Sequence, residues 1–164
     1  MSGVVRVARS YRADAQRVYD AWLDPALAGR WLFATATRPM TDVSIDARID
    51  GAFRFARHQD GGGGGYAGEY IALVPARRIV FSLSPRDEMG ATQVSVDFAT
   101  RRTGCRLALA HAGIPAPCAR QLRARWMGVL YGLGATLDLL RDAPAQSPAI
   151  AGRMTQGEAQ CITC

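Results

Sequence analysis

His111 is the residue in this sequence that is best placed to do chemistry. It shares one face of an alternating segment with Leu107 and Leu109, which predicts that its side chain points inward. An inward-facing imidazole with a near-neutral pKa could act as a general base or donate a hydrogen bond to a ligand. A histidine satisfied by a backbone carbonyl at the end of a sheet would show the same pattern, and we favour that structural interpretation.

Arg9 is a second candidate, because it falls on the apolar face of the first alternating segment, residues 4–11. The alternation predicts that Arg9 points inward, and an unpaired buried charge is very costly. We therefore expect a structural ion pair with Asp97, Asp46 or Glu69. The alternative is a contact between Arg9 and an anionic group of a ligand.

The remaining reactive side chains form no catalytic or metal-binding motif. Cys161 and Cys164 form a C-x-x-C at the C-terminus without further ligands nearby, and the sequence has only two histidines. The second histidine, His58, precedes a run of five glycines that lacks the Gly-Lys-Ser/Thr of a phosphate-binding loop. We therefore expect no metal and no cofactor, and we assign no catalytic residue.

Length and composition are those of one globular domain. The chain has 164 residues, of which 49% are hydrophobic, and a formal net charge of +6. Its arginines are dispersed, whereas a nucleic-acid-binding surface is usually a concentrated basic stripe. No apolar run approaches the roughly 20 residues that cross a bilayer, and the N-terminus lacks the apolar region of a signal peptide. We expect a cytoplasmic protein with no nucleic-acid or membrane partner.

The elements that must position these side chains follow from hydrophobic periodicity. Asp14 is the expected N-cap of a helix over residues 15–24, and Pro25 starts a second helix that ends at residue 32. Alternation predicts strands at 4–11, 43–49, 70–74, 78–84, 92–100 and 105–111, and a return strand through Phe53 and Phe55. A tight turn at Asp50-Gly51 precedes that return strand, and the glycine-rich segment 58–68 is predicted to be a mobile hairpin loop.

A long amphipathic helix is predicted over residues 118–141. Three glycines within it are costly, which indicates close packing or a need for flexibility. Residues 143–164 are rich in Pro, Ala, Gln and Ser and are expected to form a disordered tail. The apolar stripe of the helix consists of Leu122, Trp126, Val129, Leu133, Leu137 and Leu140.

These elements predict an α+β fold in which a curved antiparallel sheet of about six to seven strands wraps around the C-terminal helix. The sheet must bury one face, and the helix stripe is the largest apolar surface available to cover it. The space between them, within a single domain over 1–142, is a candidate cavity for an apolar ligand. The residues expected to contact the ligand are Phe53, Phe55, Tyr70, Phe81, Leu83, His111, Trp126 and Leu130.

A series of short motifs along the sequence carries a family resemblance. The run RVYDAWLDPALAGRWL is similar to the V-x-x-A-W-x-D-P-x-x-x-x-x-W signature of the activators of the heat-shock-protein-90 ATPase, in the START-like (SRPBCC) superfamily. Similar segments follow in order: DGAFRF at 50–55, GEY at 68–70, VPARRIVF at 74–81, VSV at 94–96, GCRLALAHAG at 104–113, and Trp126. The resemblance covers about residues 5–141 and implies the helix-grip fold.

We expect this protein to bind a small, largely apolar molecule without catalysing a reaction. The superfamily resemblance implies two alternatives, because this fold supports several functions. One is a cyclase-like or hydratase-like enzyme with His111 as its acid and base. The other is a chaperone-associated protein-interaction module. An exposed sheet edge also favours self-association, and we expect a homodimer.

Overall fold

A single antiparallel sheet and one long helix account for most of the residues that the structure describes. The computed structural model describes residues 2–34, 39–57, 65–85 and 91–142. The predicted tail, His58 and most of the predicted glycine loop lie outside these residues. The elements are β1 (Ser2–Tyr11), α1 (Ala15–Leu23), α2 (Pro25–Trp31), β2 (Asp42–Ile45), β3 (Ala52–Ala56), β4 (Gly65–Val74), β5 (Arg78–Pro85), β6 (Thr92–Arg101), β7 (Gly104–Pro115), the 3-10 turn η2 (Ala116–Cys118) and α3 (Ala119–Asp142).

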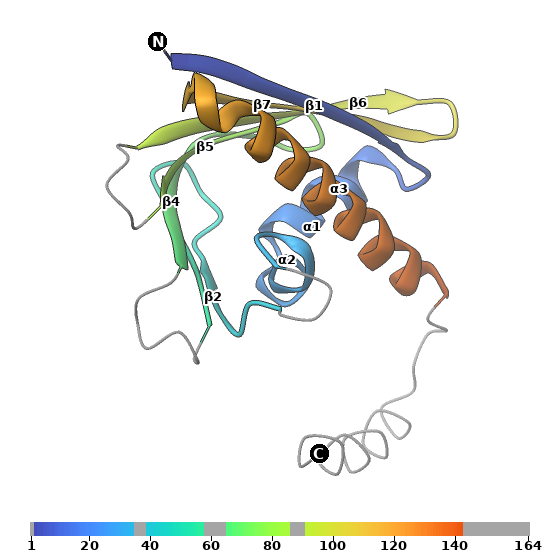
Figure 1. Ribbon diagram of the computed structural model, residues 1–164. Coiled ribbons are helices and arrows are strands. Elements are labelled where there is room, and N and C mark those ends of the chain that lie inside the picture. The colour runs from blue at the N-terminus through green and yellow to red at the C-terminus, as the bar shows by residue number, and fades with distance from the viewer. Residues whose placement is uncertain (1, 35–38, 58–64, 86–90, 143–164) are drawn as a thin grey trace, which may run out of the picture.

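The seven described strands form one sheet in the order β1-β7-β6-β5-β4-β3-β2, with each neighbouring pair antiparallel. The sheet bends around its helical side, where α3 runs beside β1 and the short helices α1 and α2 pack below α3 (Figure 1). Val5 of β1 lies opposite His111 of β7, and His111 lies opposite Val94 of β6. This arrangement confirms the α+β helix-grip architecture predicted from the sequence.

The two short helices begin at the predicted N-caps. The carboxylate of Asp14 accepts a hydrogen bond from the backbone N–H of Arg17 at 2.8 Å. The carboxylate of Asp24 accepts one from the backbone N–H of Ala26 at 2.9 Å. Pro25 occupies the first turn of α2, where a missing N–H breaks no helical hydrogen bond. Both helices contact α3, and each also packs on the sheet.

The apolar stripe of α3 is buried over most of its length. Leu122 is partly buried, but Leu140 is 36% exposed because the last turns of α3 extend past the sheet (Figure 1). Gly132 faces α2, and a Cβ at this position would lie 3.5 Å from the Cβ of Trp31, which is ordinary contact. The fully buried members of the predicted stripe are Trp126, Val129, Leu133 and Leu137.

The predicted strand over residues 43–49 is too long. β2 ends at Ile45, and the chain then turns through residues 46–51 before β3 begins. Asp50 has a positive φ of 66°, and the Gly51 N–H donates to the Arg48 carbonyl at 2.9 Å. Asp50-Gly51 therefore closes a longer connection and is not the two-residue hairpin turn that was predicted.

β4 begins at Gly65, five residues earlier than the predicted strand. Its first half pairs with β3 on one side and with the end of β5 on the other. Gly68 permits this close pairing, because a Cβ there would overlap the carbonyl oxygen of Ser82. Part of the segment predicted to be a loop is thus a strand in the middle of the sheet.

Candidate functional site

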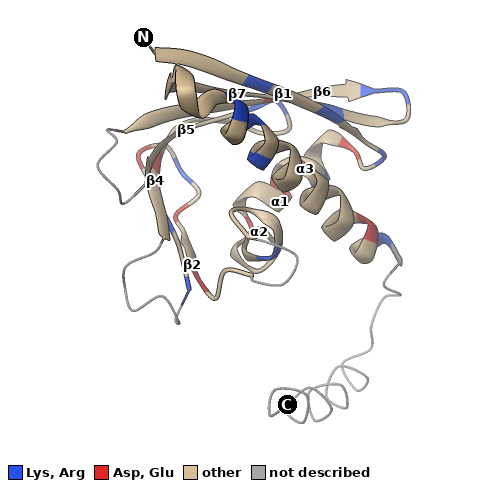
Figure 2. Ribbon diagram, in the orientation of Figure 1, with Lys and Arg blue, Asp and Glu red and all other residues tan. Residues whose placement is uncertain are grey.

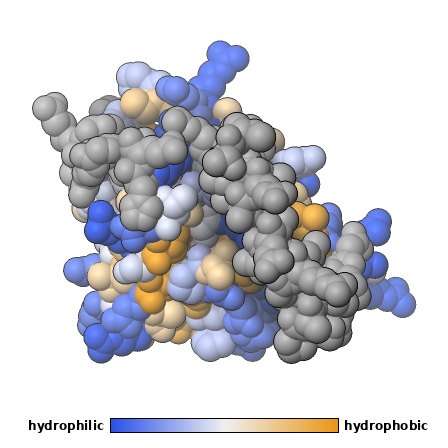
Figure 3. Space-filling view, turned by 90° about the horizontal axis from the view of Figure 1, so that it is seen from below, coloured by the Kyte–Doolittle hydropathy of each residue, from blue (hydrophilic) through white to orange (hydrophobic). Residues whose placement is uncertain are grey.

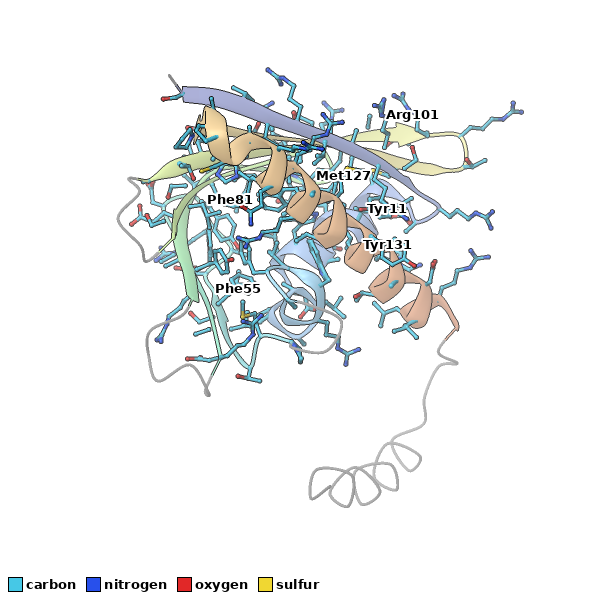
Figure 4. The ribbon with its side chains drawn as sticks, viewed as in Figure 1. Tyr11, Phe55, Phe81, Arg101, Met127 and Tyr131 are labelled. Atoms are coloured by element: carbon cyan, nitrogen blue, oxygen red, sulfur yellow. The ribbon has the colours of Figure 1, made fainter. Side chains whose placement is uncertain are left out.

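Four aromatic residues from three neighbouring strands meet on the concave side of the sheet. Phe53 and Phe55 belong to β3, Tyr70 to β4 and Phe81 to β5, and each is at most 4% exposed. The ring centroid of Phe53 lies 5.2 Å from that of Tyr70 and 5.4 Å from that of Phe81. Gly68 lies opposite Phe53 and leaves room for its ring. We call these four residues the aromatic cluster; Figure 4 labels Phe55 and Phe81.

The other four predicted ligand contacts lie in the same buried interior. Leu83 belongs to β5 and His111 to β7, while Trp126 and Leu130 belong to α3. Each is at most 4% exposed. The structure therefore brings all eight predicted residues together beneath α3, as the alternation and the helix stripe required.

His111 belongs to a chain of hydrogen bonds that crosses this apolar interior. The indole N–H of Trp126 donates to His111 Nδ1 at 3.0 Å. His111 Nε2 lies 2.7 Å from the Thr92 hydroxyl oxygen, and that hydroxyl donates to the Leu83 carbonyl at 3.1 Å. Because an indole N–H can only donate, Nδ1 must be the unprotonated nitrogen, and Nε2–H donates to Thr92. The partners of His111 are thus two side chains, not the backbone carbonyl that was predicted.

This environment keeps His111 neutral. Desolvation by burial lowers the pKa of His111 to about 4, because the charged imidazolium is disfavoured away from water. A proton on Nδ1 would also break the hydrogen bond from Trp126. Both ring nitrogens are therefore engaged at neutral pH, and the geometry gives no support to His111 as an acid and base.

Only a small void remains beside the aromatic cluster. Its volume is about 10 Å³, which is close to the minimum needed for one water molecule. The predicted contacts Leu83, His111, Trp126 and Leu130 do not line it. Its walls are the aromatic cluster together with Trp22, Leu32, Phe33 and Ile79. A ligand larger than water could enter only if one of these side chains moved.

Sequence reasoning missed four of the wall residues, Trp22, Leu32, Phe33 and Ile79, and Phe33 is the partly exposed one. It follows α2, is partly exposed, and has a positive φ of 59°, a conformation that costs a non-glycine residue roughly 1–3 kcal/mol. Its ring stacks on Tyr66 with a centroid distance of 4.2 Å and an interplanar angle of 11°. It also meets Phe55 edge to face at 5.3 Å. A lone phenylalanine after a short helix carries no sequence signal for such a position.

Two buried indole groups in this region have no hydrogen-bond partner among the described residues. Trp22 and Trp31 are each 2% exposed, and their rings meet edge to face with centroids 4.8 Å apart. The Nε1–H of each is buried, and no described residue supplies an acceptor for it. Most buried polar groups are paired, so two unpaired donors on adjacent rings, one of which lines the void, are a specific feature of this interior.

The prediction that Arg9 is buried in an ion pair is wrong. Arg9 does face the helical side of the sheet, but it is exposed at the end of β1. Its guanidinium carbon lies 5.1 Å from the ring centroid of Tyr131 on α3. The predicted partner Asp97 pairs with Arg78 instead, at 2.8 Å. The alternation predicted the face correctly, but α3 leaves that end of the face open to solvent.

No group of three or more His, Cys, Asp or Glu side chains in the described ranges could hold a metal ion. Among the helices described, none is long and apolar enough to cross a membrane.

A comparison of the sequence with models of known protein families finds one family that matches most of the chain. The model of the family described as "Activator of Hsp90 ATPase homolog 1-like protein" matches residues 12–138. The chain belongs to this family. The match spans α1 to the last turns of α3 and therefore includes the aromatic cluster and the His111 hydrogen-bond chain.

Several solved structures resemble the chain over most of its length. Protein CV1439 from Chromobacterium violaceum is 28% identical, with a TM-score of 0.71 and coverage of 80% of this chain and 95% of that one. The Mll3558 protein from Rhizobium loti is 25% identical, with a TM-score of 0.64 and coverage of 83% and 97%. The AHSA1-like protein from Aeromonas hydrophila shares the fold, with 19% identity, a TM-score of 0.73 and coverage of 88% and 99%. No curated protein matches the chain.

Proposed function

We propose that this protein binds a small, largely apolar molecule that carries a hydrogen-bond acceptor, in the aromatic cluster and without catalysis. The observation that carries the proposal concerns Trp22, one of the residues that line the void: its buried indole N–H has no partner among the described residues, and neither has that of the adjacent Trp31. A buried donor without a partner costs roughly 1–3 kcal/mol. An acceptor on a ligand would remove that cost, while the surrounding rings would bury its apolar part.

Phe33 is the side chain that would move to admit the ligand. Its left-handed backbone is strained, and it is the one partly exposed residue among the eight that line the void. Phe33 is one of several partly buried apolar residues packed against the core, and Val43 and Tyr66 are others. The surface of the molecule seen from below also shows an apolar strip among hydrophilic residues (Figure 3). An outward rotation of Phe33 would exchange its contacts for those of a ligand.

The lining also limits the charge of the ligand. The eight residues around the void are all apolar or aromatic. The titratable side chain among them is Tyr70, and burial raises its pKa, so its hydroxyl is neutral. An ionised group would lose its hydration there without gaining a charged partner among these eight side chains. A neutral ligand with one acceptor oxygen or nitrogen fits these constraints.

Binding of the neutral fluorophore N-phenyl-1-naphthylamine tests the role of Phe33. Phe33→Ala should strengthen its binding at least tenfold, because the ring that fills the site is removed. Phe98→Ala is the control for the loss of a phenyl ring, because Phe98 packs on Tyr19 and does not line the void. Equal affinities for the two variants would contradict the proposal.

A pair of ligands tests the role of the indole donors. 2-Acetylnaphthalene and 2-ethylnaphthalene have similar size, but only the first has an acceptor. Phe33→Ala should bind the ketone more tightly, and adding Trp22→Phe should reduce that preference at least threefold. A preference unchanged by Trp22→Phe would show that the Trp22 N–H does not contact the ligand.

Family membership favours a second candidate function, contact with an Hsp90-type chaperone. Met127 and Tyr131 of α3 are 55% and 65% exposed and lie one turn apart, as Figure 4 shows, so they offer an apolar surface. The ATPase rate of a purified chaperone should then rise when the protein is added, and Met127→Glu should suppress the increase. An unchanged rate would exclude stimulation of that chaperone.

A further inference from the structure

A groove rich in arginine lies at the end of the molecule where β1, the β6–β7 turn and the C-terminal half of α3 meet. Its volume is about 1200 Å³, and it is separate from the void beside the aromatic cluster. Figure 2 shows basic residues on the β6–β7 turn and around the end of β1. The arginines that line the groove are Arg9, Arg12, Arg17, Arg101, Arg102 and Arg141.

No described residue neutralises these six guanidinium groups through an ion pair. The exposed arginines that do form ion pairs, such as Arg48 with Asp46, lie elsewhere. Within the described residues, no groove arginine has a carboxylate oxygen within 4.0 Å. The groove contains only two carboxylates, and that of Asp14 accepts the backbone N–H that begins α1. The groove therefore holds a clear excess of positive charge.

The backbone of the β6–β7 turn packs closely against the end of β1, and this contact brings two arginine-bearing segments together. Gly104 ends the β6–β7 turn with a φ of 146°, and a Cβ there would overlap the carbonyl oxygen of Tyr11. The pairing of Tyr11 with Cys105 sets this register. The turn that carries Arg101 and Arg102 consequently packs against the end of β1, and both segments line the groove.

The guanidinium of Arg9, on one wall of the groove, contacts an aromatic ring. Arg9 lies over the ring of Tyr131, with its guanidinium carbon 5.1 Å from the ring centroid, a cation–π contact. Gly134, about one turn further along α3, faces the same strand: a Cβ there would make ordinary contact, 3.4 Å from Tyr11 and 3.8 Å from Arg9. Tyr11, Tyr131 and Arg101 are labelled in Figure 4.

We propose that this groove binds a small polyanion, a molecule with two or more phosphate or carboxylate groups. The planar guanidinium of arginine can donate two parallel hydrogen bonds to the oxygens of a phosphate or of a carboxylate. The guanidiniums come from β1, the β6–β7 turn and α3, around a groove of about 1200 Å³, which is much larger than one phosphate or carboxylate group. Several linked anionic groups could satisfy them together, in a concave site that partly excludes solvent.

Isothermal titration of the full-length protein with pyrophosphate and with citrate tests the proposal. At least one of these should bind, and its affinity should fall as ionic strength rises. Arg101→Gln with Arg102→Gln should weaken binding at least tenfold. Arg123→Gln with Arg125→Gln is the matched control, because it removes the same charge from exposed sites on α3 outside the groove, and should change affinity less than twofold. The stronger of the two ligands identifies the preferred anion.

Three results would overturn the proposal. The first is that neither anion binds. The second is an equal loss in the two double variants, which would assign the effect to overall charge. The third is binding to vesicles that contain phosphatidylserine without binding of either small anion, which would indicate a membrane surface as the partner. All four substitutions are at exposed positions, so matching circular dichroism spectra should confirm that folding is unchanged.

Discussion

Acid should destabilise this protein through His111. The pKa of His111 is lowered by burial from 6.5 to about 4, so between these values the unfolded chain takes up a proton that the folded chain does not. Stability therefore falls as the pH drops below 6.5, and the loss levels off below pH 4. Each pH unit in this window is worth about 1.4 kcal/mol. From pH 7.5 to pH 4.5 the loss from this one group is about 2.5 kcal/mol.

Urea unfolding, followed by tryptophan fluorescence across this pH range, would measure the effect. His111→Asn removes the titrating group while keeping an acceptor near the indole of Trp126. The stability difference between wild type and this variant should shrink by about 2.5 kcal/mol between pH 7.5 and pH 4.5. Carboxylates that titrate in the same window are common to both proteins and cancel.

A control separates titration from the loss of a hydrogen bond. Thr92→Val removes the partner of Nε2–H but leaves the imidazole buried, so its pH dependence should stay as steep as that of wild type. Parallel profiles for wild type and His111→Asn would refute the reasoning, because they would mean that His111 is as easily protonated in the folded protein as in the unfolded chain.

Three further substitutions test how the fold is held together. Tyr11→Phe removes the buried hydrogen bond from the Tyr11 hydroxyl to the Leu130 carbonyl, 2.7 Å long, and should cost about 0.5–1.5 kcal/mol by urea unfolding. Gly104→Ala should cost more than about 2 kcal/mol, since it adds a Cβ against backbone at a positive φ, whereas Gly128→Ala, at a helical site with open space, should stabilise by about 0.5–1 kcal/mol. A thermal melt of Asp14→Ala should show a loss of about 1 kcal/mol from the missing helix cap, and an unchanged melting temperature would count against that role.

Periodicity predicted the architecture well, because the segments that form the core alternate or repeat over many residues. The seven strands, the start of each short helix and the stripe of α3 all follow from it. It failed where a short segment was followed by a turn. Ile49 continues the alternation of β2 but is 58% exposed, because the chain has already turned at Asp46. Local pattern alone does not show where strand pairing stops.

The sequence predicted which residues are buried in the interior, but not how much empty volume remains among them. The eight predicted ligand contacts are buried together, yet whether space remains among them depends on Phe33, whose backbone conformation is set by contacts with Tyr66 and Phe55. The exposure of Arg9 was also impossible to predict from local pattern. Alternation fixes which face it occupies, but burial depends on where α3 covers that face.

The place of β1 in the sheet has a consequence for how the chain folds during synthesis. β1 pairs with β7 alone, and Val5 meets His111, a partner more than a hundred residues later in the chain. At about 5–20 residues per second, the ribosome needs roughly 5–20 s to make the intervening segment. Throughout that interval the first strand has no sheet to join. A nascent chain that stops before β7 would leave an unpaired strand with apolar residues exposed, so this domain can close only after β7 has been made.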